Sequence, residues 1–106
     1  MEAVLFVQIR TDNHIKSDAA ANARLEQQVR RKLKKFDERL RRVEVHISDM
    51  NGGKGGGDKR VSIEARPAGH EPIAVHAEAA RIENAVLLAA DKAARALDHS
   101  LGKQHR

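Results

Sequence analysis

Lysine and arginine side chains are concentrated in one segment of this 106-residue chain, and their chemistry is the binding of anions. Residues 24–42 carry nine cations against three acidic residues, a net charge of +6, whereas the whole chain carries +5. At this density, guanidinium and ammonium groups bind the phosphates of nucleic acids. Like charges also recur four residues apart, as at Arg31 and Lys35, which destabilises an isolated helix. We therefore favour a binding surface over the alternative, an ordinary solvated helix face.

These cations form lines if the segment is one continuous helix. The main line, within about 40° on a helical wheel, consists of Arg24, Arg31, Lys35 and Arg42. A second line consists of Arg30, Lys34 and Arg41. A later helical segment has a weaker basic flank, made of Arg81, Lys92, Arg95, His99 and Lys103, for which simple solvation is an equal alternative. On that segment, Asp91 and Asp98 lie on the outermost arc, where they can pair with Lys92 and Arg95.

The composition restricts which anionic partner these cations can bind. A helix on a membrane surface needs bulky apolar anchors, but the apolar stripe of this segment is required for the core. Proteins that bind single-stranded nucleic acid stack bases on aromatic rings. Phe6 and Phe36 are the two aromatic residues of the chain, and we expect both to be internal. The remaining partner is folded or duplex RNA, recognised through its phosphates and 2′-hydroxyl groups.

Other residues that carry chemistry do not form a recognisable site. The glycine-rich loop at residues 51–58 leads into a strand and lacks the Gly-Lys-Ser/Thr end of a phosphate-binding P-loop. The six histidines lack the spacing of a metal site, the serines lack a nucleophile context, and the chain has no cysteine. We predict no enzyme activity, no metal, no cofactor and no small-molecule substrate. Lack of cysteine suits the cytoplasm, and the apolar N-terminal run is too short to span a membrane.

Hydrophobic periodicity predicts the elements that position the cations. Alternation predicts strands at residues 4–10, 43–47, 61–65 and 73–77. A helix begins at Ser17 or Asp18 and runs to about Leu40. A second, alanine-rich helix spans residues 78–101, with Gly102 as its C-cap. The buried stripe of the first helix consists of Leu25, Val29, Leu33, Phe36 and Leu40, and that of the second of Ile82, Ala85, Val86, Ala89, Ala93, Ala96, Leu97 and Leu101.

The order of these elements predicts an α+β fold, β-α-β-β-β-α. A four-stranded mixed sheet would carry both helices on one face, because each helix must bury its apolar stripe. The first two strands are joined through a helix and are therefore expected to be parallel, with the others antiparallel. We expect residues 1–106 to form a single domain with a flexible loop at 51–58 and a short tail at 102–106. His46 and His76 would line the outer face of the sheet.

The order of several short segments resembles that of the ribosome hibernation factors. This family comprises ribosome-associated inhibitors and hibernation-promoting factors, formerly called sigma-54 modulation proteins. The matching segments are residues 7–15, 32–40, 43–49, 58–66, 72–75 and 90–97. The sequence departs from the family at residues 80–82, which lack the usual tyrosine, and in its longer glycine loop. We also expect no C-terminal dimerisation domain of the kind found in the long form.

The resemblance implies a fold similar to double-stranded-RNA-binding domains and a role in inhibiting translation on idle ribosomes. The implied partner is ribosomal RNA in the decoding region of the small subunit, with ribosomal proteins as further contacts. It assigns the contacts to Lys32, Lys35 and Arg39 on the first helix and to Lys92 and Arg95 on the second. Two alternatives remain: a general double-stranded-RNA-binding module acting off the ribosome, and a regulatory domain that binds an acidic protein.

Overall fold

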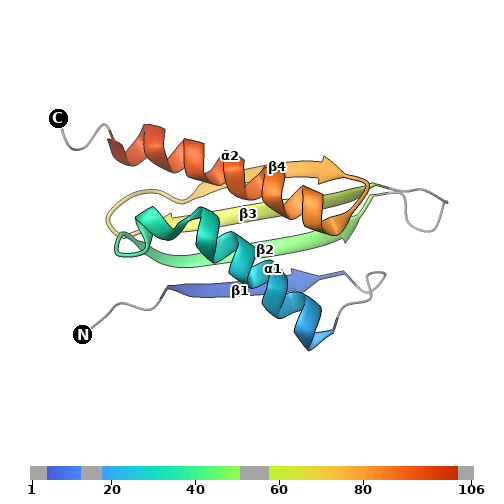
Figure 1. The fold of residues 1–106 in the computed structure, drawn as a ribbon. Helices are drawn as coiled ribbons and strands as arrows, with labels where there is room; N and C mark the ends of the chain where they lie inside the picture. Colours follow the sequence, from blue (N-terminus) through green and yellow to red (C-terminus); the bar gives the residue numbers. More distant parts are fainter. Residues whose placement is uncertain (1–4, 13–17, 51–57, 103–106) are drawn as a thin grey trace.

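The computed structural model describes residues 5–12, 18–50 and 58–102. A four-stranded sheet and two helices follow one another in the order β-α-β-β-β-α, which confirms the predicted α+β class (Figure 1). The strands are β1 (Phe6–Thr11), β2 (Leu40–Asp49), β3 (Lys59–Pro67) and β4 (Ile73–Ala79), and the helices are α1 (Ala19–Lys32), the short 3₁₀ helix η1 (Lys34–Phe36) and α2 (Ile82–Gly102). The predicted glycine loop lies mostly outside the described residues, as do Ser17 and the tail after Gly102.

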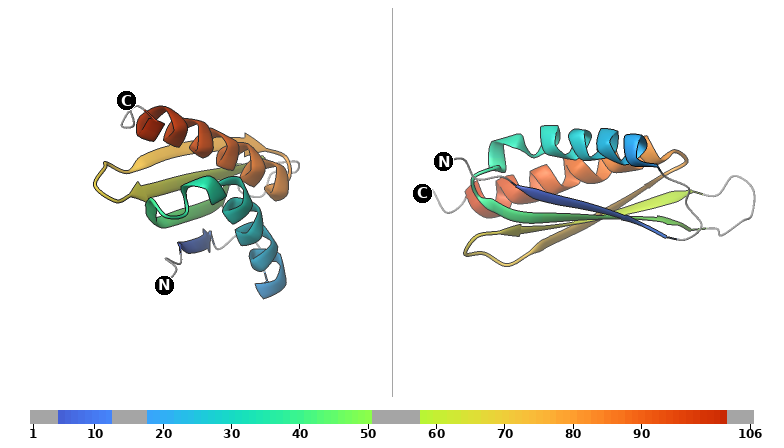
Figure 2. Two further views of the ribbon diagram at one scale, coloured as in Figure 1. Left: turned by 60° about the vertical axis from the view of Figure 1, so that its left-hand side comes forward. Right: turned by 90° about the horizontal axis from the view of Figure 1, so that it is seen from below.

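The strands lie in the sheet in chain order, β1-β2-β3-β4. As predicted, β1 is parallel to β2, and the other two pairs are antiparallel. Both helices cover one face of the sheet and leave the other face open (Figure 2). Because β1 and β2 are joined through α1, the cations of residues 24–35 are placed on the helix-covered side.

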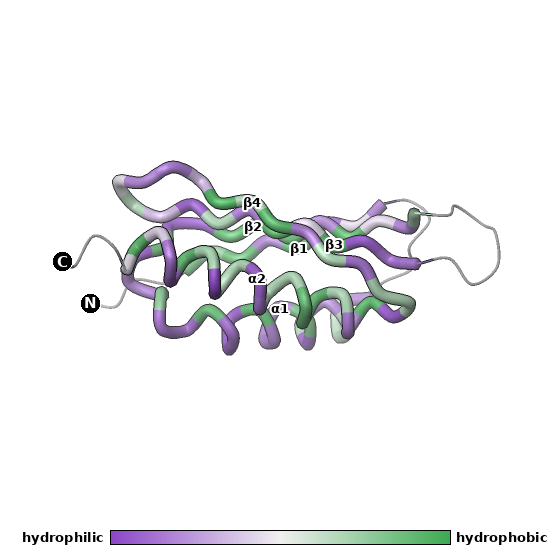
Figure 3. The backbone as a smooth tube through the Cα atoms, turned by 90° about the horizontal axis from the view of Figure 1, so that it is seen from above, coloured by the Kyte–Doolittle hydropathy of each residue, from purple (hydrophilic) through white to green (hydrophobic). Residues whose placement is uncertain are grey.

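Alternation along the strands divides the sheet into a buried and an open face (Figure 3). Val43, Val45 and Ile47 of β2 are fully buried beneath the helices, next to Val61 and Ile63 of β3. The intervening residues, among them Glu44 and His46, project from the open face. Among the described residues no polar or charged residue is buried, so the core is entirely apolar.

The first helix is shorter than predicted. It begins after Asp18, whose carboxylate accepts a 2.7 Å hydrogen bond from the Ala21 amide, as expected for an N-cap. It ends at Lys32 instead of continuing to Leu40, and η1 follows. The spacing of the apolar stripe hid this end, because a 3₁₀ turn also places residues three apart on one side. All five stripe residues are buried, but Leu40 belongs to β2.

The second helix begins later than predicted, at Ile82. The residues expected in its first turn instead extend β4, where Glu78 pairs with Arg60 of β3 and Ala79 with Lys59. Ala85, Ala89 and Ala93 are almost completely buried, so their small side chains let the helix backbone lie close to β3 and β4. Gly102 is the last helical residue and not a residue beyond the helix end.

Candidate nucleic-acid interface

Two arginines of α1 point outward from the helix layer. Arg24 and Arg31 are both exposed, seven residues apart and therefore on one line of the helix. Within the described part of the chain, neither guanidinium has a hydrogen bond or an ion pair. Their charges are free to bind an external anion, as the sequence predicts.

Two predicted RNA-binding lysines are paired with aspartates of the other helix. The Lys32 ammonium lies 2.9 Å from an Asp91 carboxylate oxygen, and that of Lys35 lies 2.8 Å from Asp98. The hydrogen bond from Lys32 lowers the pKa of Asp91 below its ordinary value; desolvation opposes this shift, and the positive charges of Lys32 and Arg95 add to it. All four side chains remain between about two-fifths and two-thirds exposed. An external phosphate can therefore reach either lysine, but it must displace a carboxylate.

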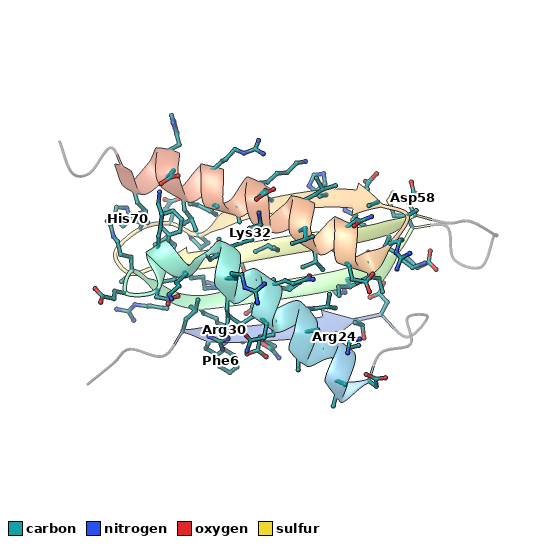
Figure 4. All side chains as sticks on the ribbon, viewed as in Figure 1. Phe6, Arg24, Arg30, Lys32, Asp58 and His70 are labelled. Carbon is teal, nitrogen blue, oxygen red and sulfur yellow. The ribbon has the colours of Figure 1, made fainter. Side chains whose placement is uncertain are left out.

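These pairs correct one sequence-based expectation. Asp91 and Asp98 were expected to pair with Lys92 and Arg95, their neighbours on the same helix. Instead, the aspartates lie on the side of α2 that faces α1, and Lys32 lies between the two helices (Figure 4). The sequence signal was present in their spacing of seven residues, which places both carboxylates on one side of α2.

The basic flank of α2 divides into two parts. The Lys92 ammonium donates a 2.9 Å hydrogen bond to the backbone carbonyl of His76 and so reaches over the edge strand β4. Arg95 is exposed and makes no hydrogen bond or ion pair with a described residue, although its charge acts on Asp91. Arg95 therefore belongs with Arg24 and Arg31 as an available cation, whereas Lys92 is partly engaged.

The remaining two predicted residues lie beyond α1. Arg39 is half-buried in the turn before β2, where its amide donates a 2.9 Å hydrogen bond to the carbonyl of Phe36. Arg42 was expected on the same helical line as Arg24, and this expectation is wrong because the helix ends at Lys32. Arg42 lies in β2 on the open face, with its guanidinium 2.8 Å from the Gln8 side-chain oxygen and 2.7 Å from Glu44.

The second predicted line of cations is also dispersed. Arg30 faces the β1 side of α1, where it forms a 2.8 Å ion pair with Glu26 (Figure 4). Lys34 lies in η1, and Arg41 lies in β2. The two predicted lines of cations are therefore not continuous, and the helix layer carries a smaller set of arginines beside two paired lysines.

The open face of the sheet holds an aromatic residue that was expected to be internal. Phe6 is 52% exposed, and the Arg42 guanidinium lies 5.1 Å from the centre of its ring. Phe36 is buried as expected. His46 and His76 project from the open face, also as expected, and His46 lies 2.8 Å from Asp12.

Among the described residues, no group of three histidine or acidic side chains is arranged to hold a metal ion. No described helix is long and apolar enough to cross a membrane.

The chain is similar to proteins that associate with ribosomes. Residues 7–105 match the family described as sigma 54 modulation protein / S30EA ribosomal protein. A ribosomal subunit interface protein from Coxiella burnetii has the same fold, with a TM-score of 0.76 and 14% identity over 92% of this chain and 98% of that one. The N-terminal domain of Thermus thermophilus Protein Y gives a TM-score of 0.68 and 17% identity over 87% and 93% of the two chains. Comparison with curated protein sequences gives no match.

Proposed function

Because the chain belongs to the sigma 54 modulation protein / S30EA ribosomal protein family, we propose that it is a ribosome-associated hibernation factor. In this proposal it binds small-subunit ribosomal RNA in the decoding region, where tRNA and mRNA otherwise lie, and thereby inhibits translation. It acts in the cytoplasm and catalyses no reaction. Association with the ribosome, without a specified binding region, is supported by the family membership and by the shared fold.

The observation that carries the proposal is the set of available cations on the helix layer. Arg24, Arg31 and Arg95 present guanidinium groups that no described residue binds. A guanidinium can donate two parallel hydrogen bonds to one phosphate, which suits the closely spaced phosphates of folded RNA. Lys32 and Lys35 lie beside them and add two contacts once their aspartates are displaced.

The helix layer favours folded RNA over single strands. Its aromatic residue, Phe36, is 5% exposed and cannot stack a base. Recognition must then depend on phosphates and 2′-hydroxyl groups, which a folded RNA presents in a fixed arrangement. A rigid pair of helices can match such an arrangement, because its cations are held at fixed separations by a shared apolar core.

Sedimentation with purified ribosomal subunits tests the proposal. We expect the protein to sediment with the small subunit and to be displaced by tRNA. The variant with Arg24, Arg31 and Arg95 all changed to Gln should lose this binding and keep its melting temperature. The matched control changes Arg10, Arg60 and Arg66, which lie on the open face, to Gln and should still bind.

Binding to an RNA duplex and treatment with nuclease separate the two alternatives. A general module for double-stranded RNA would bind any duplex as tightly as the small subunit, and tRNA would displace it from both. A domain that binds an acidic protein would keep its partner after nuclease treatment. Either result would overturn the proposed function.

A further inference from the structure

A half-open cleft lies at the end of the molecule where α1 and α2 begin. Its volume is about 380 Å³, within the range of small-ligand sites. It is bounded by the first half of α1, the start of α2 and the adjoining ends of β1, β2 and β3. Apolar side chains line its interior, namely Leu25, Ile47 and Ile82. The cleft therefore offers an apolar interior of a size that a single planar ring system fills.

The rim of the cleft is positively charged. Arg24 of α1, Lys59 of β3 and Arg81, in the connection before α2, line it together with one carboxylate, Glu83; Lys59 lies 3.5 Å from Asp49. The guanidinium of Arg81 is 3.9 Å from Glu83 and its side chain is three-quarters exposed, so this pair is weak. Arg24 has no partner among the described residues. A phosphate at this rim would meet at least two available guanidinium groups.

Two amides that line the cleft have side-chain oxygens without hydrogen-bond partners. The side-chain oxygens of Asn22 and Gln28 are buried, and no described group donates to either. A buried acceptor without a donor destabilises the folded state. A ligand that brings N–H groups into the cleft would remove this destabilisation.

We propose that this cleft binds a nucleotide, with the base against the apolar interior and the phosphate at the cationic rim. The exocyclic amino group of adenine, cytosine or guanine would donate to the oxygens of Asn22 and Gln28. The nucleotide is either free or an unpaired residue of a bound RNA, and in the second case the inference deepens the proposed function. A nucleotide in this cleft departs from the sequence-based expectation of no small-molecule substrate.

Backbone amide chemical shifts of the ¹⁵N-labelled protein test whether the cleft binds a free nucleotide. We expect AMP and CMP to shift the amides around the cleft in a saturable manner, with weaker effects from UMP and from inorganic phosphate. Arg81→Gln should weaken AMP binding by about tenfold, the loss of one charge-assisted phosphate contact. Arg66→Gln, which removes an exposed arginine of the open face that does not line the cleft, should leave it unchanged. A variant with Asn22→Leu and Gln28→Leu should lose the preference for AMP over UMP.

Two RNA hairpins of equal length test whether the cleft binds an unpaired nucleotide of a bound RNA. One is fully paired, and the other carries a single unpaired adenosine. Tighter binding of the second hairpin, abolished by Arg81→Gln, would assign the cleft to an RNA nucleotide. Absence of AMP shifts together with equal affinity for both hairpins would overturn the inference. Because neither assay uses ribosomes, the cleft and the proposed function can fail independently.

Discussion

The two faces of the sheet both carry arginines, but their side chains have different surroundings. On the open face, Arg66 lies 3.0 Å from Glu64, and Arg60 lies 3.8 Å from Glu78. Arg42 there contacts Glu44 and Gln8. On the helix layer, Arg30 pairs with Glu26, but Arg24, Arg31 and Arg95 have no such partner within the described residues; on the open face, Arg10 is likewise without one.

This difference shows that a count of cations is a poor guide to a binding surface. An arginine beside a carboxylate already has an anion next to its guanidinium, and a phosphate gains little by replacing one anion with another. An unpaired arginine binds phosphate without that exchange and releases counterions from the RNA. The helix layer is therefore the better anion-binding face, although both faces are basic in sequence.

The largest expected effect is the response of small-subunit binding to salt. If about five phosphates are neutralised, a fivefold rise in salt should weaken binding on the order of a thousandfold. Equilibrium binding at several monovalent salt concentrations and constant magnesium measures this slope. An affinity that does not change between low and moderate salt would contradict recognition through phosphates.

Stability and binding should separate at the end of α1. Leu33 is fully buried, and Leu33→Ala should lower the free energy of unfolding by roughly 2–5 kcal/mol. Lys35→Glu should instead weaken RNA binding. It also places a carboxylate beside Asp98, so we expect a loss of stability well under about 1 kcal/mol at this exposed site. Thermal melts and filter binding of both variants measure the two effects; unfolding of Lys35→Glu would show that this side chain belongs to the core.

Charge reversal on the two faces compares them directly. Arg31→Glu should weaken binding to the small subunit by about 1–3 kcal/mol, because one charge-assisted phosphate contact is lost and a repulsion is added. Arg66→Glu changes the net charge equally but lies on the open face, and should have little effect. Equal losses in filter binding would mean that the overall charge, not the helix layer, determines affinity.

The two cations of α2 should differ from one another. Arg95 is available, whereas the Lys92 ammonium donates to the His76 carbonyl. We expect Arg95→Ala to weaken binding by about 1 kcal/mol and Lys92→Ala by less. A calorimetric titration of each variant with small subunits measures both; a larger loss for Lys92 would place the RNA on the β4 side of α2.

The sequence was sufficient to predict the order of elements, the buried stripe of the first helix and the parallel first pair of strands. On the second helix, Ile82 and Ala96 of the predicted stripe are only partly buried, and Ala90, which the stripe omitted, is buried. The sequence-based prediction failed at the end of α1, because Leu33, Phe36 and Leu40 keep the spacing of a helix while the chain passes through a 3₁₀ turn into β2. That single error moved Arg42 to the opposite face of the sheet. Periodicity records which residues are buried, and it does not distinguish a helix from a turn that buries the same residues.

Contacts between α1 and α2 could not be predicted for a related reason. The pairing of Lys32 with Asp91 depends on how the two helices are placed over the sheet, which the separate helical wheels do not contain. The wheel did place Asp91 and Asp98 on one side of α2. It could not show that this side faces α1. The cleft between the starts of the two helices could not be predicted for the same reason.

The smallest expected effect on RNA affinity concerns the two lysines that are paired with aspartates. It tests directly whether a neighbouring carboxylate opposes phosphate binding. If an aspartate beside a lysine opposes phosphate binding, then removing the aspartate should raise affinity for RNA. Because the pKa of Asp91 is lowered by Lys32, its pair persists at acidic pH and is lost only as the pH falls through that lowered value. Acidification therefore mimics removal of this carboxylate only below about pH 4, the ordinary value for aspartate.

The variant with Asp91→Asn and Asp98→Asn should bind a generic RNA duplex about three- to tenfold more tightly, with a steeper dependence on salt, because two ammonium groups become available. Each lost pair is exposed, so stability should fall only slightly. The matched control, Glu44→Gln with Glu64→Gln, adds the same net charge on the open face. A gain confined to the aspartate variant would show that these two carboxylates limit the affinity of the helix layer for unselected RNA. An equal gain in the control would mean that net charge alone is responsible.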